Sequence, residues 1–422
     1  MVKRAIPIHG FVAPGFEPVR EEFVRNFEER GEPGAACAIY SKGEKVVDLW
    51  GGYRDKRIQA PWEEDTLVIV FSSTKGLSAL ALALANSRGY FDYEAPVAHY
   101  WPEFAQNGKE RITIRQLLAH EAGLAVIEEP LTLQILADKD ALAAILARQR
   151  PLWEPGTRHG YHGFSLGWYE SELIRHTDPR HRTLGQFFQD ELATPLGLEF
   201  YIGVPPSVPA ERIATVTEPW LVPKLLGMPR GMMLSALNPR SLAIRTVNPR
   251  IHSNLLLNSP AFRALEMPSM GGIGQASSIA RAYSVFATGG KELGITSQTL
   301  AALRTPAVPP TQGWMDLVLH RDMGYSLGFL KPFPGYQFGS SAAAFGAPGS
   351  GGSFGFADPD AQVGYAYVMN HQGVRVLDEP REKILRDTFY RCLQQVAERQ
   401  VMPEAKVFRR IFVLPLHDVS FT

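Results

Sequence analysis

Hydrophobic positions recur at two different spacings near the start of the chain, and each spacing predicts a different element. Val19, Phe23 and Phe27 follow one another at intervals of four, which predicts an amphipathic helix. Two apolar runs come next, at 35–40 and 45–51, and the Gly-containing turn between them is typical of a β-hairpin. The chain therefore opens with a helix followed by two paired strands.

A third apolar run, at 66–71, changes character at Ser72. From Ser72 to Ser87 the chain is dense in Ala and Leu, and neither Pro nor Gly occurs after Gly76. Such a composition favours a helix that is buried on all sides, and Gly89 is a suitable residue to end it.

The middle of the chain has helical spacing and the last third has strand-like runs. Helices are predicted at 114–120, 132–148, 184–193, 277–287 and 379–399, and strands at 325–330, 353–357 and 363–369. Pro recurs through 203–260, which predicts long ordered loops and short helices there.

Strands at both ends with helices between them predict an α/β sandwich, an α+β arrangement in which an antiparallel sheet is flanked by helices. We expect one domain formed by residues 1–95 together with 265–422. Residues 96–264 then form an inserted, mostly helical lobe, and the active site lies at the seam.

Composition excludes several classes of protein. Among the 422 residues, 43 Lys and Arg balance 43 Asp and Glu, so no excess positive charge is present to bind nucleic acid. A hydrophobic content of 45% excludes a disordered chain. No apolar run approaches the roughly 20 residues of a membrane span, and the first ten residues lack the apolar core of a signal peptide. We expect a cytoplasmic protein without membrane contact; the sequence leaves its oligomeric state open.

The cysteines and histidines give no sign of a metal or cofactor. Cys37 and Cys392 lie in apolar surroundings typical of buried free thiols, although the sequence leaves a disulfide between them open. Two pairs of closely spaced histidines lack further ligands at metal-binding spacing; they are His159 with His162, and His176 with His181. No phosphate-binding Gly loop or dinucleotide fingerprint is present, so we predict no cofactor.

The tetrapeptide Ser72-Ser73-Thr74-Lys75 carries the candidate chemistry. If the helix begins here, Ser72 lies at its N-terminus and Lys75 lies one turn along on the same face. A serine hydroxyl needs a base to become a nucleophile, and burial favours the neutral form of a Lys that could serve as one. The alternative is that Ser72 only caps the helix.

Four segments in the same order resemble serine β-lactamases and penicillin-binding proteins, specifically the class C and family VIII carboxylesterase branch. They are Val68–Gly76 with its Ser-x-x-Lys, Ile112–Leu124, Pro155–Thr157 followed by Tyr161, and Gly349–Ser353 followed by Phe356–Pro359. Four ordered matches are far more specific than any one of them. The resemblance implies the β-lactamase/transpeptidase-like fold.

The resemblance also implies roles for individual residues. Ser72 is expected to be the nucleophile, Lys75 its base, and Tyr161 the group that passes the proton to the leaving group. The oxyanion hole is expected to be the backbone N–H groups of Ser72 and Ser350, the latter on the edge strand. A neighbouring cation lowers the pKa of a Tyr, so we expect Lys75 and Tyr161 to titrate as a coupled pair.

Two positions depart from the family pattern and bear on substrate binding. Gly163 occupies the Asn position of Tyr-x-Asn, and the third motif begins Ala347-Pro348-Gly349 where Lys, His or Trp is usual at its first position. Loss of these polar groups favours a neutral ester over the carboxylate of a β-lactam or peptide. His162 is either a replacement donor to the substrate or a structural residue.

Three Gly-x-Ser-x-Gly patterns, around Ser165, Ser326 and Ser353, suggest a different nucleophile. The strand–turn–helix elbow that this motif requires is not predicted around any of them, so we attribute them to high Gly usage.

The sequence thus predicts a cofactor-free serine hydrolase that forms an acyl-enzyme on Ser72. We expect a carboxylesterase for short-chain or small hydrophobic esters. Three alternatives stay open: an amide hydrolase acting on a β-lactam or D-peptide, an acyltransferase to an alcohol, and a catalytically weak relative that binds a ligand or partner.

Overall fold

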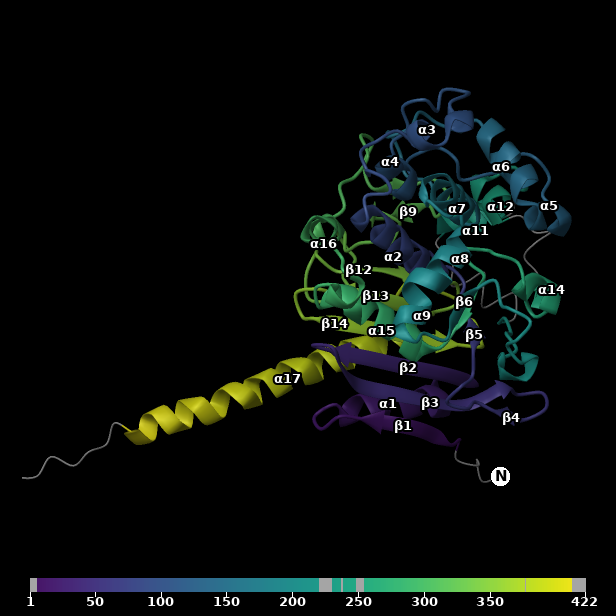
Figure 1. Cartoon of the computed structure of the whole chain (residues 1–422). Coiled ribbons are helices and arrows are strands. Elements are labelled where there is room, and N and C mark those ends of the chain that lie inside the picture. Colours follow the sequence, from purple (N-terminus) through teal and green to yellow (C-terminus); the bar gives the residue numbers. More distant parts are fainter. Residues whose placement is uncertain (1–5, 220–229, 237, 248–253, 376, 412–422) are drawn as a thin grey trace, which may run out of the picture.

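The computed structural model describes residues 6–219, 230–236, 238–247, 254–375 and 377–411 (Figure 1). Within these residues the main sheet has nine strands, all paired antiparallel, in the order β1-β3-β2-β14-β13-β12-β11-β10, with β4 added beside β3. The first three strands come from the start of the chain and the last five from its end. This arrangement confirms the predicted antiparallel sheet of an α/β fold.

The strand boundaries follow the predicted runs closely in most places. The strands are β1 Ile8–Val12, β2 Gly34–Ser41, β3 Glu44–Asp55, β4 Ala60–Pro61, β5 Val68–Ile69, β6 Phe200–Ile202, β7 Gly272–Gly274, β8 Met315–Asp316, β9 Arg321–Asp322, β10 Tyr325–Ser326, β11 Phe329–Leu330, β12 Phe345–Pro348, β13 Phe354–Asp358 and β14 Val363–Met369. The single strand predicted at 325–330 is wrong: Leu327 and Gly328 both have positive φ and turn the chain between β10 and β11.

Helices account for most of the rest. They are α1 Glu17–Glu29, α2 Ser73–Ser87, α3 Val97–Tyr100, α4 Ile114–Leu118, α5 Leu133–Ala137, α6 Lys139–Arg148, α7 Ser165–Thr177, α8 Leu184–Phe188, α9 Thr194–Leu196, α11 Arg230–Ala236, α12 Leu242–Val247, α13 Asn254–Leu257, α14 Pro260–Arg263, α15 Ala276–Ala287, α16 Ser297–Arg304 and α17 Pro380–Ile411. The single helix predicted at 132–148 is wrong, because the Asp138 side chain caps a new helix by accepting from the N–H groups of Asp140 and Ala141.

The two faces of the sheet carry different side chains and therefore different helices. On β14, Tyr365, Tyr367 and Met369 enter the core shared with α1 and α17, whereas Gly364 and Ala366 face α15. A Cβ at Gly364 would lie 2.4 Å from the Ala280 carbonyl oxygen, so only glycine lets α15 pack this close to the strand. Small residues on one face thus bring a helix layer directly onto the sheet.

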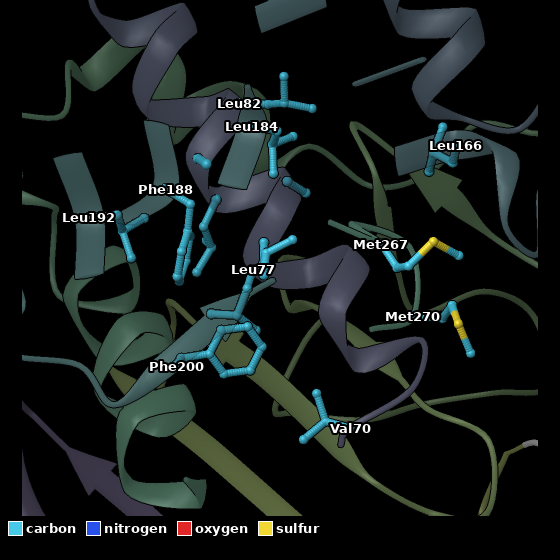
Figure 2. Close-up of a cluster of buried hydrophobic side chains, with 14 of the residues drawn as sticks. Val70, Leu77, Leu82, Leu166, Leu184, Phe188, Leu192, Phe200, Met267 and Met270 are labelled. Carbon is cyan, nitrogen blue, oxygen red and sulfur yellow. The ribbon is translucent and has the colours of Figure 1, made fainter. Parts of the chain in front are cut away.

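Helix α2 runs through the centre of the larger core. Every residue from Ser73 to Ala85 is buried, as the Ala/Leu composition predicts. Figure 2 shows Leu77 and Leu82 of α2 among apolar side chains from several other segments, including Phe188 and Met267. Because its whole circumference is covered, α2 is a fixed scaffold for the residues at its N-terminus.

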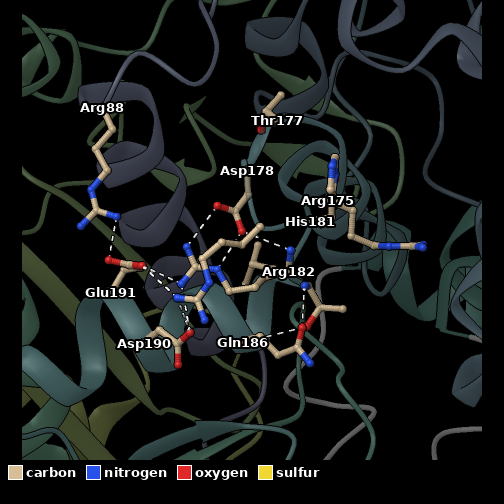
Figure 3. A network of polar contacts seen from close by, with 12 residues as sticks. Arg88, Arg175, Thr177, Asp178, His181, Arg182, Gln186, Asp190 and Glu191 are labelled. Carbon is tan, nitrogen blue, oxygen red and sulfur yellow. Dashed lines mark hydrogen bonds and ion pairs between the residues drawn. The ribbon is translucent and has the colours of Figure 1, made fainter.

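A polar network holds the other end of α2. Arg88 donates to Glu191 at 2.7 Å, and Glu191 accepts from Arg182 at 2.6 Å (Figure 3). Arg182 also binds Asp178 at 2.7 Å. These contacts connect the C-terminus of α2 to the segments around α8.

The predicted division into residues 1–95 with 265–422 and a lobe at 96–264 stays a prediction. In Figure 1 most helices from the middle of the chain lie above the sheet, and α17 extends away from the body. Parts of the Pro-rich 203–260 region fall outside the described residues; its described parts contain the short helices α11 to α14.

The structure leaves both cysteines unpaired: Cys37 and Cys392 are buried free thiols. Among the described helices, none combines the length and apolar character that crossing a membrane requires.

A buried ion cluster attaches the start of α17 to the sheet. Arg381 binds Glu32 at 3.0 Å and Glu379 at 3.1 Å, and all three side chains are almost fully buried. Arg381 also donates to the carbonyl oxygen of His371 at 3.0 Å. Removing one partner of a buried ion pair leaves the other charge buried without an opposite charge beside it.

We therefore expect Arg381→Ala to lower the free energy of unfolding by about 3–5 kcal/mol, the usual effect of breaking a buried ion pair. Urea unfolding followed by circular dichroism measures this change. The matched control is Arg304→Ala, whose partner Asp360 lies in a largely exposed pair, and it should cost less than about 1 kcal/mol. Equal effects of the two substitutions would contradict the prediction.

Candidate active site

Ser72 lies in a strained turn between β5 and α2. The preceding Phe71 has φ +50°, a left-handed conformation that side chains other than glycine rarely adopt. Ser72 is partly exposed although Phe71 and residues 73–85 are buried. It occupies the N-cap position, yet among the described residues its hydroxyl makes no capping hydrogen bond. The interpretation of Ser72 as a helix cap is therefore wrong, and its hydroxyl is presented at the end of a rigid helix.

Lys75 places its amine beside that hydroxyl. Its Nζ lies 3.4 Å from Ser72 Oγ and donates to two backbone carbonyl oxygens, of Gly163 at 2.8 Å and Ser269 at 2.9 Å. The side chain is 3% exposed. Burial lowers the pKa of Lys75 to about 7, and the opposing attraction comes from Glu170. Near neutral pH a substantial fraction of Lys75 is therefore the unprotonated amine that can accept a proton.

Residue 163 is Asn in the family pattern and Gly in this chain. Here the backbone carbonyl oxygen of Gly163 accepts the hydrogen bond from the Lys75 amine. A Cβ at Gly163 would lie 2.8 Å from the Thr246 methyl group. Thr246 on α12 therefore fills the space of a side chain at residue 163. The site binds Lys75 through the backbone here and has no room for an amide side chain.

Tyr161 completes the group around Ser72. Its ring lies against the Lys75 amine, with Nζ 4.8 Å from the ring centroid, and its hydroxyl makes a side-chain hydrogen bond with Ser72. The expectation that Lys75 lowers the pKa of Tyr161 is wrong. Burial raises the pKa of Tyr161, and the bond to Ser72 opposes this only in part. Tyr161 is therefore a neutral phenol at pH 7, suited to donating a proton.

Behind Tyr161 lies a buried polar group formed by His162, a candidate from the sequence, and His120, for which the sequence suggested no role. His120 Nδ1 lies 2.8 Å from His162 Nδ1 and accepts from the His162 backbone N–H at 3.0 Å. Burial lowers the pKa of both imidazoles, so they are neutral at pH 7. Because His120 Nδ1 accepts the His162 backbone N–H, the proton between the two Nδ1 atoms belongs to His162. Nε2 of a neutral His162 is then unprotonated and can only accept a hydrogen bond, so this arrangement favours the structural alternative for His162 over the substrate donor.

Asp316 and Tyr325 support the other side of Tyr161. The Tyr325 ring stacks on Tyr161 at 6.1 Å and its hydroxyl donates to Asp316 at 3.2 Å. Asp316 also accepts a backbone hydrogen bond from Tyr161, although burial raises its own pKa to about 6. Asp316 lies in no motif, and Tyr325 occurs only within the Gly-x-Ser-x-Gly pattern around Ser326, which points to a different residue. A buried Asp followed by Tyr in a loop-rich segment is too weak a signal to find them.

The turn after β12 is pressed against the nucleophile turn. Ser353 Oγ donates to the Val70 carbonyl oxygen at 2.7 Å and lies 3.1 Å from Ser73 Oγ. A Cβ at Gly349 would lie 2.4 Å from the same Val70 oxygen. These contacts bring residues 349–353 beside Ser72, where the Ser350 N–H is predicted to complete an oxyanion hole.

The expected place of Ser350 on the edge strand is wrong. Strand β12 lies inside the sheet between β11 and β13, and Ser350 follows it in the turn. On β12, Ala347 is buried and would lie 3.0 Å from a Cβ at Gly76 of α2. The small side chain at 347 is therefore packed against the helix that carries Ser72 and Lys75.

The other candidate serines have structural surroundings. Ser165 donates to the Leu124 carbonyl oxygen at 2.8 Å, and Ser326 lies on β10, which turns directly into another strand. Ser353 holds the Val70 carbonyl. Among the described residues, no three His, Cys, Asp or Glu side chains are grouped to hold a metal ion.

Comparisons with known proteins agree with this geometry. The sequence profile of the beta-lactamase family matches residues 21–387. The esterase/beta-lactamase LipL of Mycobacterium tuberculosis is 32% identical over 86% of this chain and 83% of its own. A family VIII carboxylesterase structure has a TM-score of 0.80 at 34% identity, covering 92% of this chain and 100% of that one. A penicillin-binding-protein homologue from Caulobacter crescentus gives 0.78 and 35% with the same coverage.

The close approach at Gly163 yields a test by double substitution. Gly163→Ala should lower the free energy of unfolding by about 1–3 kcal/mol, the usual cost of overpacking, because its Cβ meets the Thr246 methyl. Thr246→Ser removes that methyl and should restore most of the loss in the double variant. Thermal unfolding of the two single variants and the double variant measures the coupling; additive effects would show that the two positions do not contact each other.

Proposed function

Because the chain belongs to the beta-lactamase family, we propose that it is a serine hydrolase that acts as a carboxylesterase on short-chain or small hydrophobic esters. One observation carries the proposal: the partly exposed Ser72 hydroxyl, not used as a helix cap, lies 3.4 Å from a buried amine whose pKa is near 7. A hydroxyl next to a neutral amine has the base that it needs to become a nucleophile.

In the proposed reaction, Ser72 Oγ attacks the ester carbonyl carbon while Lys75 takes the hydroxyl proton. The negative charge that develops on the carbonyl oxygen is stabilised by the Ser72 and Ser350 N–H groups and by the N-terminus of α2. Tyr161 gives its proton to the leaving alkoxide and regains one from Lys75. Water then attacks the acyl-enzyme, releasing the acid and returning the proton to Ser72.

The preference for esters rests on Ala347 and Gly163. Neither side chain can bind the carboxylate of a β-lactam or peptide, and the Asn position is filled by Thr246. A neutral ester needs no such group. The relatives support this assignment, since family VIII carboxylesterase and esterase are among their descriptions. Hydrolysis of a β-lactam is the second candidate, favoured by the description of the Mycobacterium tuberculosis relative as an esterase/beta-lactamase. Transfer of the acyl group to an alcohol uses the same acyl-enzyme.

Ser72→Ala should lower the turnover of p-nitrophenyl acetate and butyrate by about 10³-fold or more, as loss of a serine nucleophile does. A phosphonate inhibitor should add one adduct to the wild-type protein, located on Ser72 by peptide mass. Ser326→Ala is the matched control, since it removes the serine of a Gly-x-Ser-x-Gly pattern whose hydroxyl makes none of the contacts described around Ser72, and should keep its activity.

Three outcomes of this experiment decide between the alternatives. Ester turnover that survives Ser72→Ala would refute the nucleophile assignment. Nitrocefin turnover faster than ester turnover would favour the β-lactam hydrolase. A wild-type protein that turns over neither substrate and takes up no phosphonate would favour the ligand-binding relative.

The pKa of Lys75 also predicts a pH dependence. Because the base must be unprotonated, kcat/KM for p-nitrophenyl butyrate should rise with pH through a midpoint near 7, and at pH 6 it should be about tenfold below the plateau. Lys75→Arg keeps a charge that is not lost in this range and should be inactive throughout. A profile that is flat between pH 6 and pH 8 would show that Lys75 is not the base.

A further inference from the structure

Glu170 is a buried carboxylic acid that the proposed reaction does not use. It lies on α7, and its side chain is fully buried. Neither carboxyl oxygen has a hydrogen-bond partner among the residues that the structure describes. Buried carboxyl groups without a hydrogen-bond partner are rare, because an ionised carboxylate that loses its hydration and gains no partner destabilises the folded protein.

The position of this carboxyl connects it to Lys75. A Cβ placed at Gly328 would lie 3.4 Å from Glu170 Oε1 and 2.8 Å from the Cβ of Ala79. The carboxyl therefore lies beside Ala79, which follows Lys75 by one turn of α2 and shares its face. Helix α7 thus places an acid next to the same side of α2 that carries the candidate base.

Lys75 is the charged group that acts on Glu170. Burial raises the pKa of Glu170 to about 8, and attraction to Lys75 opposes the rise. The same attraction opposes the fall in the pKa of Lys75. In a medium of low polarity, two such groups titrate as a pair whose steps belong to neither one alone.

Glu170 is the carboxyl group whose charge acts on Lys75, and the other titratable groups near the site are either uncharged at neutral pH or engaged with other partners. His120 and His162, from the segments next to α4 and α7, have lowered pKa values, and that of Tyr161 is raised. On α7 itself, Glu172 is paired with Arg175 at 2.9 Å. Tyr325 of β10 donates to Asp316.

We propose that Glu170 is a positioning residue for the candidate base: its carboxyl and the Lys75 amine together hold one proton, and the ionised carboxylate sets the pH at which Lys75 becomes a base. The inference rests on the proposed function for its effect on catalysis. Before acylation the pair exists as carboxylic acid with amine or as carboxylate with ammonium. After Lys75 accepts the Ser72 proton the pair holds two protons, and it returns to one when Tyr161 is reprotonated.

The test compares pH profiles of kcat/KM for wild type and Glu170→Gln. In wild type the rise should be broad, because the pair loses two protons in separate steps. Glu170→Gln leaves one titrating amine, so its rise should follow a single proton. The midpoint should move to lower pH by about half a unit or more, because the carboxylate that held the proton on Lys75 is gone. Glu172→Gln is the matched control on the same helix, and its midpoint should not move.

A second measurement does not depend on activity. In the infrared spectrum at pH 7, Glu170→Gln should lose the carboxylic-acid band of Glu170 that wild type shows, whereas the band of Glu121, whose pKa burial raises to about 7, should remain in both. Since the pKa of Glu170 is higher in the folded than in the unfolded chain, wild-type stability falls as pH rises from about 4.5 toward 8. The Tm advantage of Glu170→Leu over wild type should therefore grow across this range, and this variant also serves if Glu170→Gln does not fold.

The outcomes separate this inference from the proposed function. If the wild type hydrolyses esters through Ser72 and the Glu170→Gln midpoint equals that of wild type, the inference is overturned. A Tm difference independent of pH, together with an unchanged infrared band, overturns it as well. If esters are not hydrolysed, the proposed function fails, and the infrared and Tm measurements still decide whether Glu170 holds the proton.

Discussion

An amine moved into a protein loses its hydration, and Lys75 recovers only part of it from the carbonyl oxygens of Gly163 and Ser269. These two residues lie 88 and 194 positions further along the chain, so only the folded protein creates the environment that lowers the pKa of Lys75, the candidate base. The Ser269 segment is itself fixed to α2, because Ser78 donates to the Pro268 carbonyl oxygen at 2.8 Å. These contacts exclude water from the Lys75 amine and hold it beside Ser72.

The same loss of hydration shifts the pKa of Tyr161, the proton donor of the proposed mechanism, in the opposite direction. Burial favours the neutral form of any titratable group, so it lowers the pKa of Lys75 and raises that of Tyr161. One neutral base and one neutral proton donor then meet at a single hydroxyl. At pH 7 Tyr161, His120 and His162 are uncharged and Lys75 is partly so. These groups suit the uncharged ester of the proposed function, in agreement with the absence of a cationic side chain at Ala347.

Features with a local signal in the sequence were predictable. The hairpin of β2 and β3, the helix after Ser72 and the small group of Ser72, Lys75 and Tyr161 all follow from spacing, composition or motif. The positions that were missed depend on tertiary contacts: Glu170 and Asp316 occur in no motif, and Thr246 matters only because it fills the space beside Gly163. The pKa of Tyr161 was wrong in sign because burial, which no short segment reveals, outweighs the neighbouring amine. The break at Asp138 was the exception, since Asp before a helix is a capping signal that the sequence already contained.

The central pairing of the sheet joins β2, at residues 34–41, to β14, at residues 363–369. A ribosome that adds 5–20 residues per second needs about 15 to 65 seconds to make the chain between them. Throughout that time the hairpin of β2 and β3 lacks β14, so the backbone hydrogen-bonding groups along one edge of β2 have no partner strand. Pairs this distant in sequence make folding slow, because a long loop must close before the contact is gained. The candidate site, which includes residues 349–353, is thus completed only late in the synthesis of this protein, and an unfinished chain carries Ser72 and Lys75 without the complete fold around them.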